Sequence, residues 1–159
     1  MELFVIAMQM EKEGESFYRD IARKAATQGF RTIFSMLADD EASHRQTFEA
    51  MKKNAPMVMV DSTVSEKAEV VFETIVKEDF LSEQSQLSIY EKALEIELKS
   101  IEFYSEQLET LDREDQRKNL ERIIREERMH YDLIDDIIVL VERPESWVEH
   151  AEFGVREDY

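Results

Sequence analysis

The segments MEKEGESFY (residues 10–18) and DEASH (residues 40–44) return later in the chain as IELKSIEFY (residues 96–104) and EERMH (residues 126–130). The later copies begin 86 residues after the earlier ones, at 96 instead of 10 and at 126 instead of 40. Each copy places a glutamate thirty residues before a Glu-x-x-His sequence. We interpret this repeat as four carboxylates and two imidazoles, from four segments, that form one symmetric metal site.

Around the repeat, inward-facing residues recur at spacings of three and four, which is typical of amphipathic helices. The pattern predicts four long helices: from near residue 1 to about 26, from Phe30 to Met51, from Tyr90 to Gln107 and from Leu120 to Val141. The first and second helices, and the third and fourth, are joined by short connections. Each of these pairs is therefore expected to form an antiparallel hairpin.

About thirty residues connect the two hairpins, which is too many for a simple turn. Asn54 and Pro56 are expected to end the preceding helix. Helical spacing then predicts one crossover helix from Glu66 to Phe80, on the outside of the bundle, with Ser62 or Ser65 as its cap.

A single long crossover in an up-and-down bundle is the connectivity of ferritin-like folds. We therefore predict an all-α, ferritin-like four-helix bundle over residues 1–142, with the crossover at about 55–85. Residues 143–159 are predicted to be a C-terminal tail that begins beside Pro144, where the last helix ends.

The composition limits the functions open to such a bundle. With 37 Asp and Glu against 20 Lys and Arg, the formal charge of −17 disfavours nucleic-acid and membrane partners. The sequence has neither a spanning apolar segment nor a signal peptide, so a cytoplasmic location is expected. Because the chain has no Cys, any metal must be held by oxygen and nitrogen.

Four glutamates of the repeat fall on the inward stripes of the predicted helices: Glu11, Glu41, Glu97 and Glu127. Buried carboxylates without a cation cost several kcal/mol, and no Lys or Arg falls on the same stripes near the middle of the bundle. His44 and His130 follow two of the glutamates by one helical turn, so each pair can grip one ion. Two divalent ions would balance the charge, with iron favoured and manganese or zinc possible in the same groups.

These segments resemble the rubrerythrin-like branch of the ferritin-like superfamily, over residues 1 to about 142. The resemblance implies six metal ligands, with Glu41 and Glu127 bridging; the set is Glu11, Glu41, His44, Glu97, Glu127 and His130. It also implies that Tyr18 and Tyr104 hydrogen-bond ligand carboxylates. Asp40 and Glu126 are implied to orient the histidines of the opposite hairpin.

The chain departs from that family's usual pattern at two points. The typical enzymes carry a further glutamate one turn after the third-helix ligand, where this chain has Ser100. They also carry an iron module held by four cysteines, and this chain has no Cys. Any reductant is therefore expected to be an external electron donor.

The resemblance implies a di-iron oxidoreductase that reduces hydrogen peroxide or dioxygen. A ferroxidase or iron-storage role, similar to bacterioferritin, is one alternative, and a non-catalytic metal-binding protein is another. A second apolar stripe on the third helix, which includes Leu94, Leu98, Ile101 and Leu108, is expected to pack on the crossover helix or to build a homodimer interface.

Overall fold

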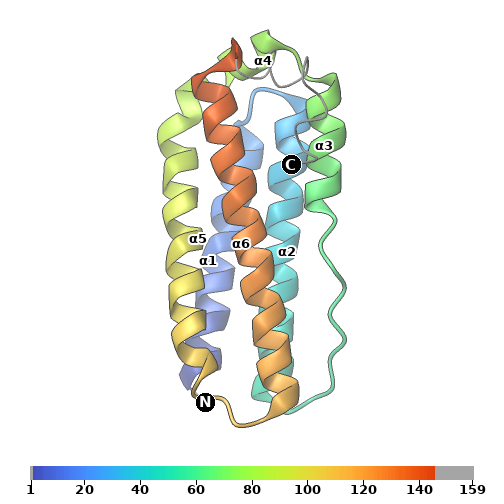
Figure 1. Ribbon diagram of the computed structural model, residues 1–159, viewed down its shortest axis with the longest axis vertical. Helices are drawn as coiled ribbons and strands as arrows, with labels where there is room; N and C mark the ends of the chain where they lie inside the picture. Colours follow the sequence, from blue (N-terminus) through green and yellow to red (C-terminus); the bar gives the residue numbers. More distant parts are fainter. Residues whose placement is uncertain (1, 146–159) are drawn as a thin grey trace.

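Four long helices form an antiparallel bundle in the computed structural model, which describes residues 2–145 (Figure 1). They are α1 (Glu2–Lys24), α2 (Gln28–Lys52), α5 (Leu87–Leu108) and α6 (Glu114–Glu142). Within the described part of the chain there is no strand. The predicted all-α, ferritin-like bundle is confirmed, whereas the tail from residue 146 onward lies outside the described residues.

The residues that flank α2 in the sequence explain where this helix begins and ends. Thr27 precedes α2, and its hydroxyl accepts a hydrogen bond from the backbone N–H of Phe30 at 3.3 Å. At the other end Asn54 takes a left-handed backbone conformation with φ of 54°, which asparagine tolerates better than most residues. The helix therefore stops where Asn54 and Pro56 predicted that it would.

The crossover differs from the single helix predicted over Glu66 to Phe80, and that prediction is wrong. The chain first runs without helix along the outside of the bundle and then forms α3 (Val64–Thr74), α4 (Lys77–Ser82) and the short 3-10 helix η1 (Gln84–Gln86) (Figure 1).

The break between α3 and α4 falls at two residues with extended backbone, Ile75 and Val76. Ile75 is buried, whereas Val76 is half exposed. The Asp79 side chain accepts a hydrogen bond from the backbone N–H of Val76 at 3.1 Å. The break therefore buries Ile75 and lets Asp79 start a new helix. Neither predicted cap is the N-cap residue of α3, which is Thr63. Ser62 precedes it and accepts a hydrogen bond from the N–H of Val64 at 3.2 Å, whereas Ser65 lies inside α3.

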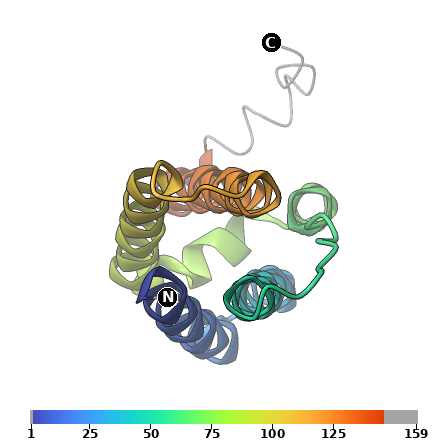
Figure 2. The same ribbon diagram turned by 90° about the horizontal axis from the view of Figure 1, so that it is seen from below.

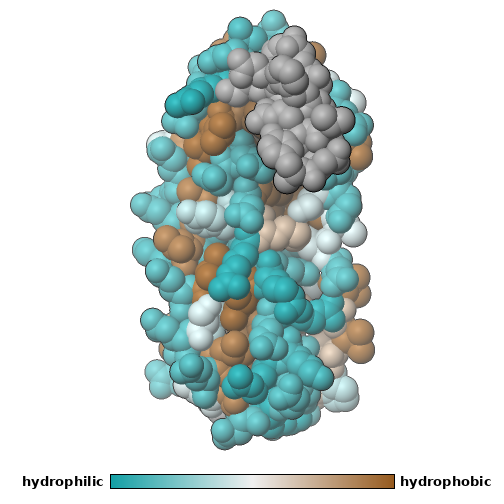
Figure 3. Space-filling model, viewed as in Figure 1, coloured by the Kyte–Doolittle hydropathy of each residue, from teal (hydrophilic) through white to brown (hydrophobic). Residues whose placement is uncertain are grey.

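Helix α3 packs against α2, and α3 and α5 lie on opposite sides of the bundle (Figure 2). The second apolar stripe of α5 is therefore not covered by α3, and its Leu98 is 44% exposed. The homodimer interface stays a prediction. Hydrophilic side chains cover most of the face in Figure 3, with hydrophobic residues scattered between them.

Two apolar clusters fill the bundle, one toward each end, and the polar residues of the repeat lie between them. One cluster contains Phe30, Phe34 and Tyr90, in which Phe34 and Tyr90 stack with ring centroids 5.2 Å apart. The other contains Phe4 and Phe48. The bundle thus encloses the candidate site between two layers that exclude water.

Candidate metal centre

All six residues predicted as ligands lie together in the middle of the bundle, each at most 2% exposed. They come from the four long helices: Glu11 from α1, Glu41 and His44 from α2, Glu97 from α5, and Glu127 and His130 from α6. Helical spacing turns all six inward, because each lies one or two turns from buried apolar residues on the same stripe. The structure brings every predicted ligand to one place, and their role as ligands stays a prediction.

The six residues divide into two groups of four whose candidate ligand atoms lie within 4.8 Å of one another. One group is Glu11, Glu41, His44 and Glu127, and the other is Glu41, Glu97, Glu127 and His130. Both groups include Glu41 and Glu127. These are the two glutamates that the sequence resemblance assigns as bridges, and their position between the groups allows that role.

The Nδ1 atoms of both histidines face this centre. His44 Nδ1 lies 3.1 Å from Glu11 Oε1 and 3.4 Å from Glu127 Oε1. His130 Nδ1 lies 3.3 Å from Glu97 Oε2 and 3.3 Å from Glu127 Oε1. The two halves therefore repeat one geometry, with Glu127 near both imidazoles.

Several buried polar atoms of the centre have no hydrogen-bond partner. They are Oε1 of Glu41, Oε1 of Glu97, both carboxylate oxygens of Glu127, and Nδ1 of His130. Among the described residues no Lys or Arg is buried, so no side-chain cation compensates these carboxylates. Unpaired buried carboxylates are costly, whereas carboxylate oxygens and imidazole nitrogens suit divalent iron or manganese. The donor set therefore fits a pair of metal ions.

The outer nitrogen of each histidine contacts a carboxylate of the opposite hairpin. His44 Nε2 lies 2.7 Å from Glu126 Oε1, and His130 Nε2 lies 2.8 Å from Asp40 Oδ2. In a neutral imidazole, a carboxylate at this position accepts a hydrogen bond from Nε2–H, which leaves the Nδ1 lone pair directed at the centre. Asp40 and Glu126 thus make the contacts that the resemblance implies.

The two tyrosines of the repeat also reach across between the hairpins. Tyr18 of α1 donates a hydrogen bond to Oε2 of Glu97, and Tyr104 of α5 donates one to Oε2 of Glu11. Both tyrosines are buried, so water does not compete for these two hydrogen bonds. Tyr104 leaves Oε1 of Glu11 to His44, whereas the Glu97 oxygen that Tyr18 holds is also the one 3.3 Å from His130 Nδ1.

Burial and mutual repulsion change the protonation of the metal-free centre. Burial first, and then the charge of Glu127, raises the pKa of Glu97 to about 7. Burial alone would lower the pKa of His44 and His130, but the surrounding carboxylates outweigh it and raise both pKa values well above the usual value. Burial likewise raises the pKa of Glu127, but the two histidine rings, whose Nδ1 atoms lie 3.3 and 3.4 Å from its Oε1, outweigh burial and lower this pKa. In the metal-free protein the raised histidine pKa values favour protonated imidazoles, which bring positive charge among these carboxylates.

Gly14 occupies the place in the first copy that Ser100 occupies in the second. A Cβ atom at Gly14 would lie 2.6 Å from Glu41 Oε2, so the carboxylate of Glu41 uses the space that the missing side chain leaves. Ser100 is buried beside Glu97 on the same stripe of α5. The room expected beside the site at Gly14 is therefore present.

Two residues of functional interest were not identified as such from the sequence. Ser62, expected only as a helix cap, contacts both Asp40 and Glu126. Glu83, outside every predicted stripe, is fully buried beneath the turn between α1 and α2. Neither lies in the repeat, so the sequence offers no signal beyond their residue types.

A four-helix bundle that presents one Glu from each of two helices and a Glu-x-x-His from each of the other two has the ligand pattern of di-iron and di-manganese carboxylate proteins. The model of the family described as Rubrerythrin matches residues 2–138, and the chain belongs to the rubrerythrin family. No match was found among curated proteins or among solved structures. Family and buried cluster together indicate metal binding of the di-iron type. Among residues 2–145, no helix is long and apolar enough to span a membrane.

Proposed function

We propose that this protein is a two-iron oxidoreductase that reduces hydrogen peroxide or dioxygen with electrons from an external donor. The observation that carries the proposal is the pair of shared carboxylates, Glu41 and Glu127, which belongs to both four-residue groups. Carboxylates shared in this way would hold two metal ions side by side, so that both could be available to one small substrate. A centre for a single structural ion would need only one of the groups.

In this proposal Glu11 and His44 complete one iron site, and Glu97 and His130 complete the other. Four carboxylates and two neutral imidazoles carry a charge of about minus four, which two divalent ions balance. The bound iron pair would supply two electrons, one from each ion, as the conversion of hydrogen peroxide and two protons into two water molecules requires.

In this proposal the protein's own residues hold the ligand side chains in place and keep water away from them. Tyr18 and Tyr104 hold the two terminal glutamates by hydrogen bonds from opposite hairpins. Asp40 and Glu126 hold the histidine rings so that Nδ1 faces inward. The apolar layers on both sides keep bulk water out, which strengthens each of these electrostatic contacts.

A surface pocket of about 190 Å³ lies next to the centre and is a candidate entry for a small substrate. Its lining includes Ser62, Glu126 and Met129 together with the arginines Arg122 and Arg125. Glu126 connects this pocket directly to His44 through the 2.7 Å contact. A molecule as small as peroxide could approach the centre from this side.

The test is anaerobic loading with ferrous iron, followed by addition of hydrogen peroxide. We expect two iron ions per chain, loss of peroxide and the appearance of ferric absorption. The Glu97→Ala variant removes a ligand from one group only and should lose most of the peroxide turnover while keeping part of the iron. Two bound iron ions without any peroxide or dioxygen consumption would instead support a non-catalytic metal-binding protein.

A ferroxidase or iron-storage role is the second candidate, because Ser100 stands where typical rubrerythrins have a further glutamate. Storage requires a large hollow shell of many chains. A solution mass of two chains, the homodimer that we propose, excludes storage. Particles that take up hundreds of iron ions per assembly would favour it over the oxidoreductase.

A further inference from the structure

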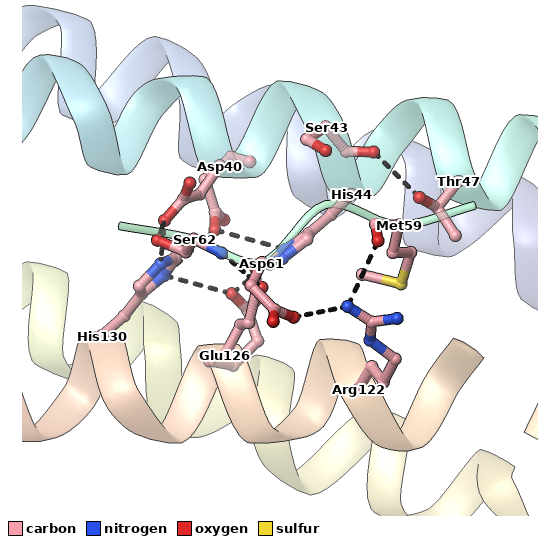
Figure 4. Close-up of polar contacts among 12 residues, drawn as sticks. Asp40, Ser43, His44, Thr47, Met59, Asp61, Ser62, Arg122, Glu126 and His130 are labelled. Atoms are coloured by element: carbon pink, nitrogen blue, oxygen red, sulfur yellow. Dashed lines mark hydrogen bonds and ion pairs between the residues drawn. The ribbon is translucent and has the colours of Figure 1, made fainter. Parts of the chain in front are cut away.

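We propose that Ser62 is a positioning residue that holds both of the carboxylates which orient the two histidines. Ser62 belongs to the non-helical part of the crossover, between α2 and α3, and lies between Asp40 of α2 and Glu126 of α6 (Figure 4). The inference rests on the proposed two-metal centre. The symmetry of the centre comes from the sequence repeat, and Ser62 lies outside that repeat.

Ser62 reaches the two carboxylates with different groups. Its backbone N–H donates to Glu126 Oε2 at 3.0 Å, while Oε1 of the same carboxylate contacts His44. Its hydroxyl donates to Oδ2 of Asp40, the oxygen that also contacts His130 Nε2 at 2.8 Å. One residue therefore links the outer sides of both histidines.

A third contact uses the hydroxyl oxygen as an acceptor and leaves its proton available to Asp40. The backbone N–H of Val64 donates to Ser62 Oγ at 3.2 Å, so this oxygen already accepts one hydrogen bond. A serine hydroxyl has a single proton, and that proton is then directed at the Asp40 carboxylate. The result is a chain of contacts from the start of α3 through Ser62 and Asp40 to His130.

The segment that carries Ser62 is itself anchored on α6. The Arg122 guanidinium donates to the backbone oxygen of Met59 at 3.3 Å and forms an ion pair with Asp61 (Figure 4). Met59 is buried within the apolar cluster that also contains Phe4 and Phe48. Because Met59 and Asp61, which precede Ser62 in the chain, are both held, Ser62 has little freedom to leave the two carboxylates.

The side chains of Asp40 and Glu126 are only 16% and 14% exposed, so few water molecules can replace the contacts from Ser62. Because the hydroxyl serves Asp40 and the backbone N–H serves Glu126, replacing the side chain alone should disturb only the half that contains His130. A residue that merely stabilised the crossover would affect both halves alike.

The experiment uses the full chain with ¹⁵N-labelled histidine, whose three residues are His44, His130 and His150. Histidine signals are recorded in the metal-free protein and after titration with Zn²⁺, a diamagnetic probe. The variants are Ser62→Ala, Ser62→Thr and, as a control for loosening of α3, Val64→Ala, which removes part of a fully buried side chain.

In Ser62→Ala we expect the His130 ring signals to shift in the metal-free protein while those of His44 stay in place. Zn²⁺ affinity in the His130 half should fall about threefold to tenfold, below the 10- to 100-fold typical when the oriented carboxylate itself is replaced. Ser62→Thr, which keeps the hydroxyl, should restore both readouts. Val64→Ala should lower the melting temperature without moving the His130 signals.

Unchanged His130 signals in Ser62→Ala, or equal shifts of His44 and His130, would overturn the inference. The metal-free spectra decide this whether or not metal binds. If the unsubstituted protein binds fewer than two Zn²⁺ and two Fe²⁺ ions, the two-metal centre fails instead, and the two failures are thus told apart.

Discussion

Two kinds of buried carboxylate occur in this bundle, and they are satisfied in opposite ways. Glu83 accepts hydrogen bonds from the backbone N–H groups of Ala26 and Thr27 at 3.0 Å each, from the Thr27 hydroxyl at 3.1 Å and from the Tyr90 hydroxyl at 2.9 Å. Glu127, equally buried, has no conventional hydrogen-bond partner at either oxygen.

The difference separates a carboxylate that supports the fold from one that is available to a metal. Around Glu83 the neutral donors of a loop and a tyrosine use both oxygens, so the carboxylate closes the connection between α1 and α2. Glu127 Oε1 instead lies 3.3 Å from His130 Nδ1 and 3.4 Å from His44 Nδ1, without a hydrogen bond to either nitrogen. Burial alone therefore does not distinguish a candidate metal ligand from a structural carboxylate, whereas buried oxygens without hydrogen-bond donors do.

Replacing Glu127 by glutamine gives the largest expected effect. Glu127→Gln keeps the size of the side chain and removes the charge of a predicted ligand that both four-residue groups share. We expect affinity for both metals to fall by more than about 100-fold, beyond the loss typical of replacing an orienting carboxylate. Calorimetric titration with Mn²⁺ or Zn²⁺ measures this. Loss of one ion only would contradict the shared position of Glu127.

Replacing Glu83 tests the other side of the comparison. Glu83→Ala leaves the N–H groups of Ala26 and Thr27 and the Tyr90 hydroxyl without their acceptor. We expect the free energy of unfolding to fall by about 3 kcal/mol, the cost of more than one unsatisfied buried donor. Urea denaturation measures the loss, and metal stoichiometry should stay at two per chain. A variant of normal stability would show that Glu83 does not hold the turn.

The matched positions Gly14 and Ser100 test the space beside Glu41, the side chain that a methyl group at position 14 would meet. Gly14→Ala places a methyl group 2.6 Å from Glu41 Oε2, so the carboxylate must move. We expect metal affinity to fall about tenfold, near the lower end of the usual cost of overpacking. Ser100→Ala, the control at the equivalent place in the repeat, adds no atoms and should change affinity less. Equal losses in both variants would refute the role given to the space at Gly14.

The pH dependence of the metal-free protein is the smallest expected effect. The histidine pKa values are raised above the ordinary 6.5, so their stabilising contribution is present below that pH and is lost as pH rises. The pKa of Glu97, raised from 4.5 to about 7, acts in the same direction between those values.

The melting temperature without metal should therefore fall as pH rises from about 5 to 8. The increase in melting temperature on adding Zn²⁺ should grow over the same range, because the metal displaces protons from these groups. Thermal melts at several pH values, with and without Zn²⁺, check both trends. A metal effect that is the same at all pH values would contradict proton displacement.

Much of the fold and of the candidate centre could be predicted because the decisive information is local. Spacings of three and four place Glu41 and His44, for example, on one face of a helix whatever else the chain does. The long connection between the hairpins predicted the ferritin-like order of helices. The break at Ile75 and Val76 could not be predicted, because helical spacing continues through it while the burial of Ile75 depends on the bundle beneath.

By itself, the sequence determined the four helices, the doubled Glu and Glu-x-x-His pattern, and the excess of inward carboxylates over inward cations. Only the tertiary structure decided which groups complete each contact, such as Tyr18 with Glu97, Glu83 with the turn before α2, and Ser62 with Asp40 and Glu126. The physical reason is the distance along the chain over which each kind of interaction acts. Helical periodicity is set by neighbours within one or two turns, whereas these hydrogen bonds join residues far apart in the chain that only the packed bundle brings together.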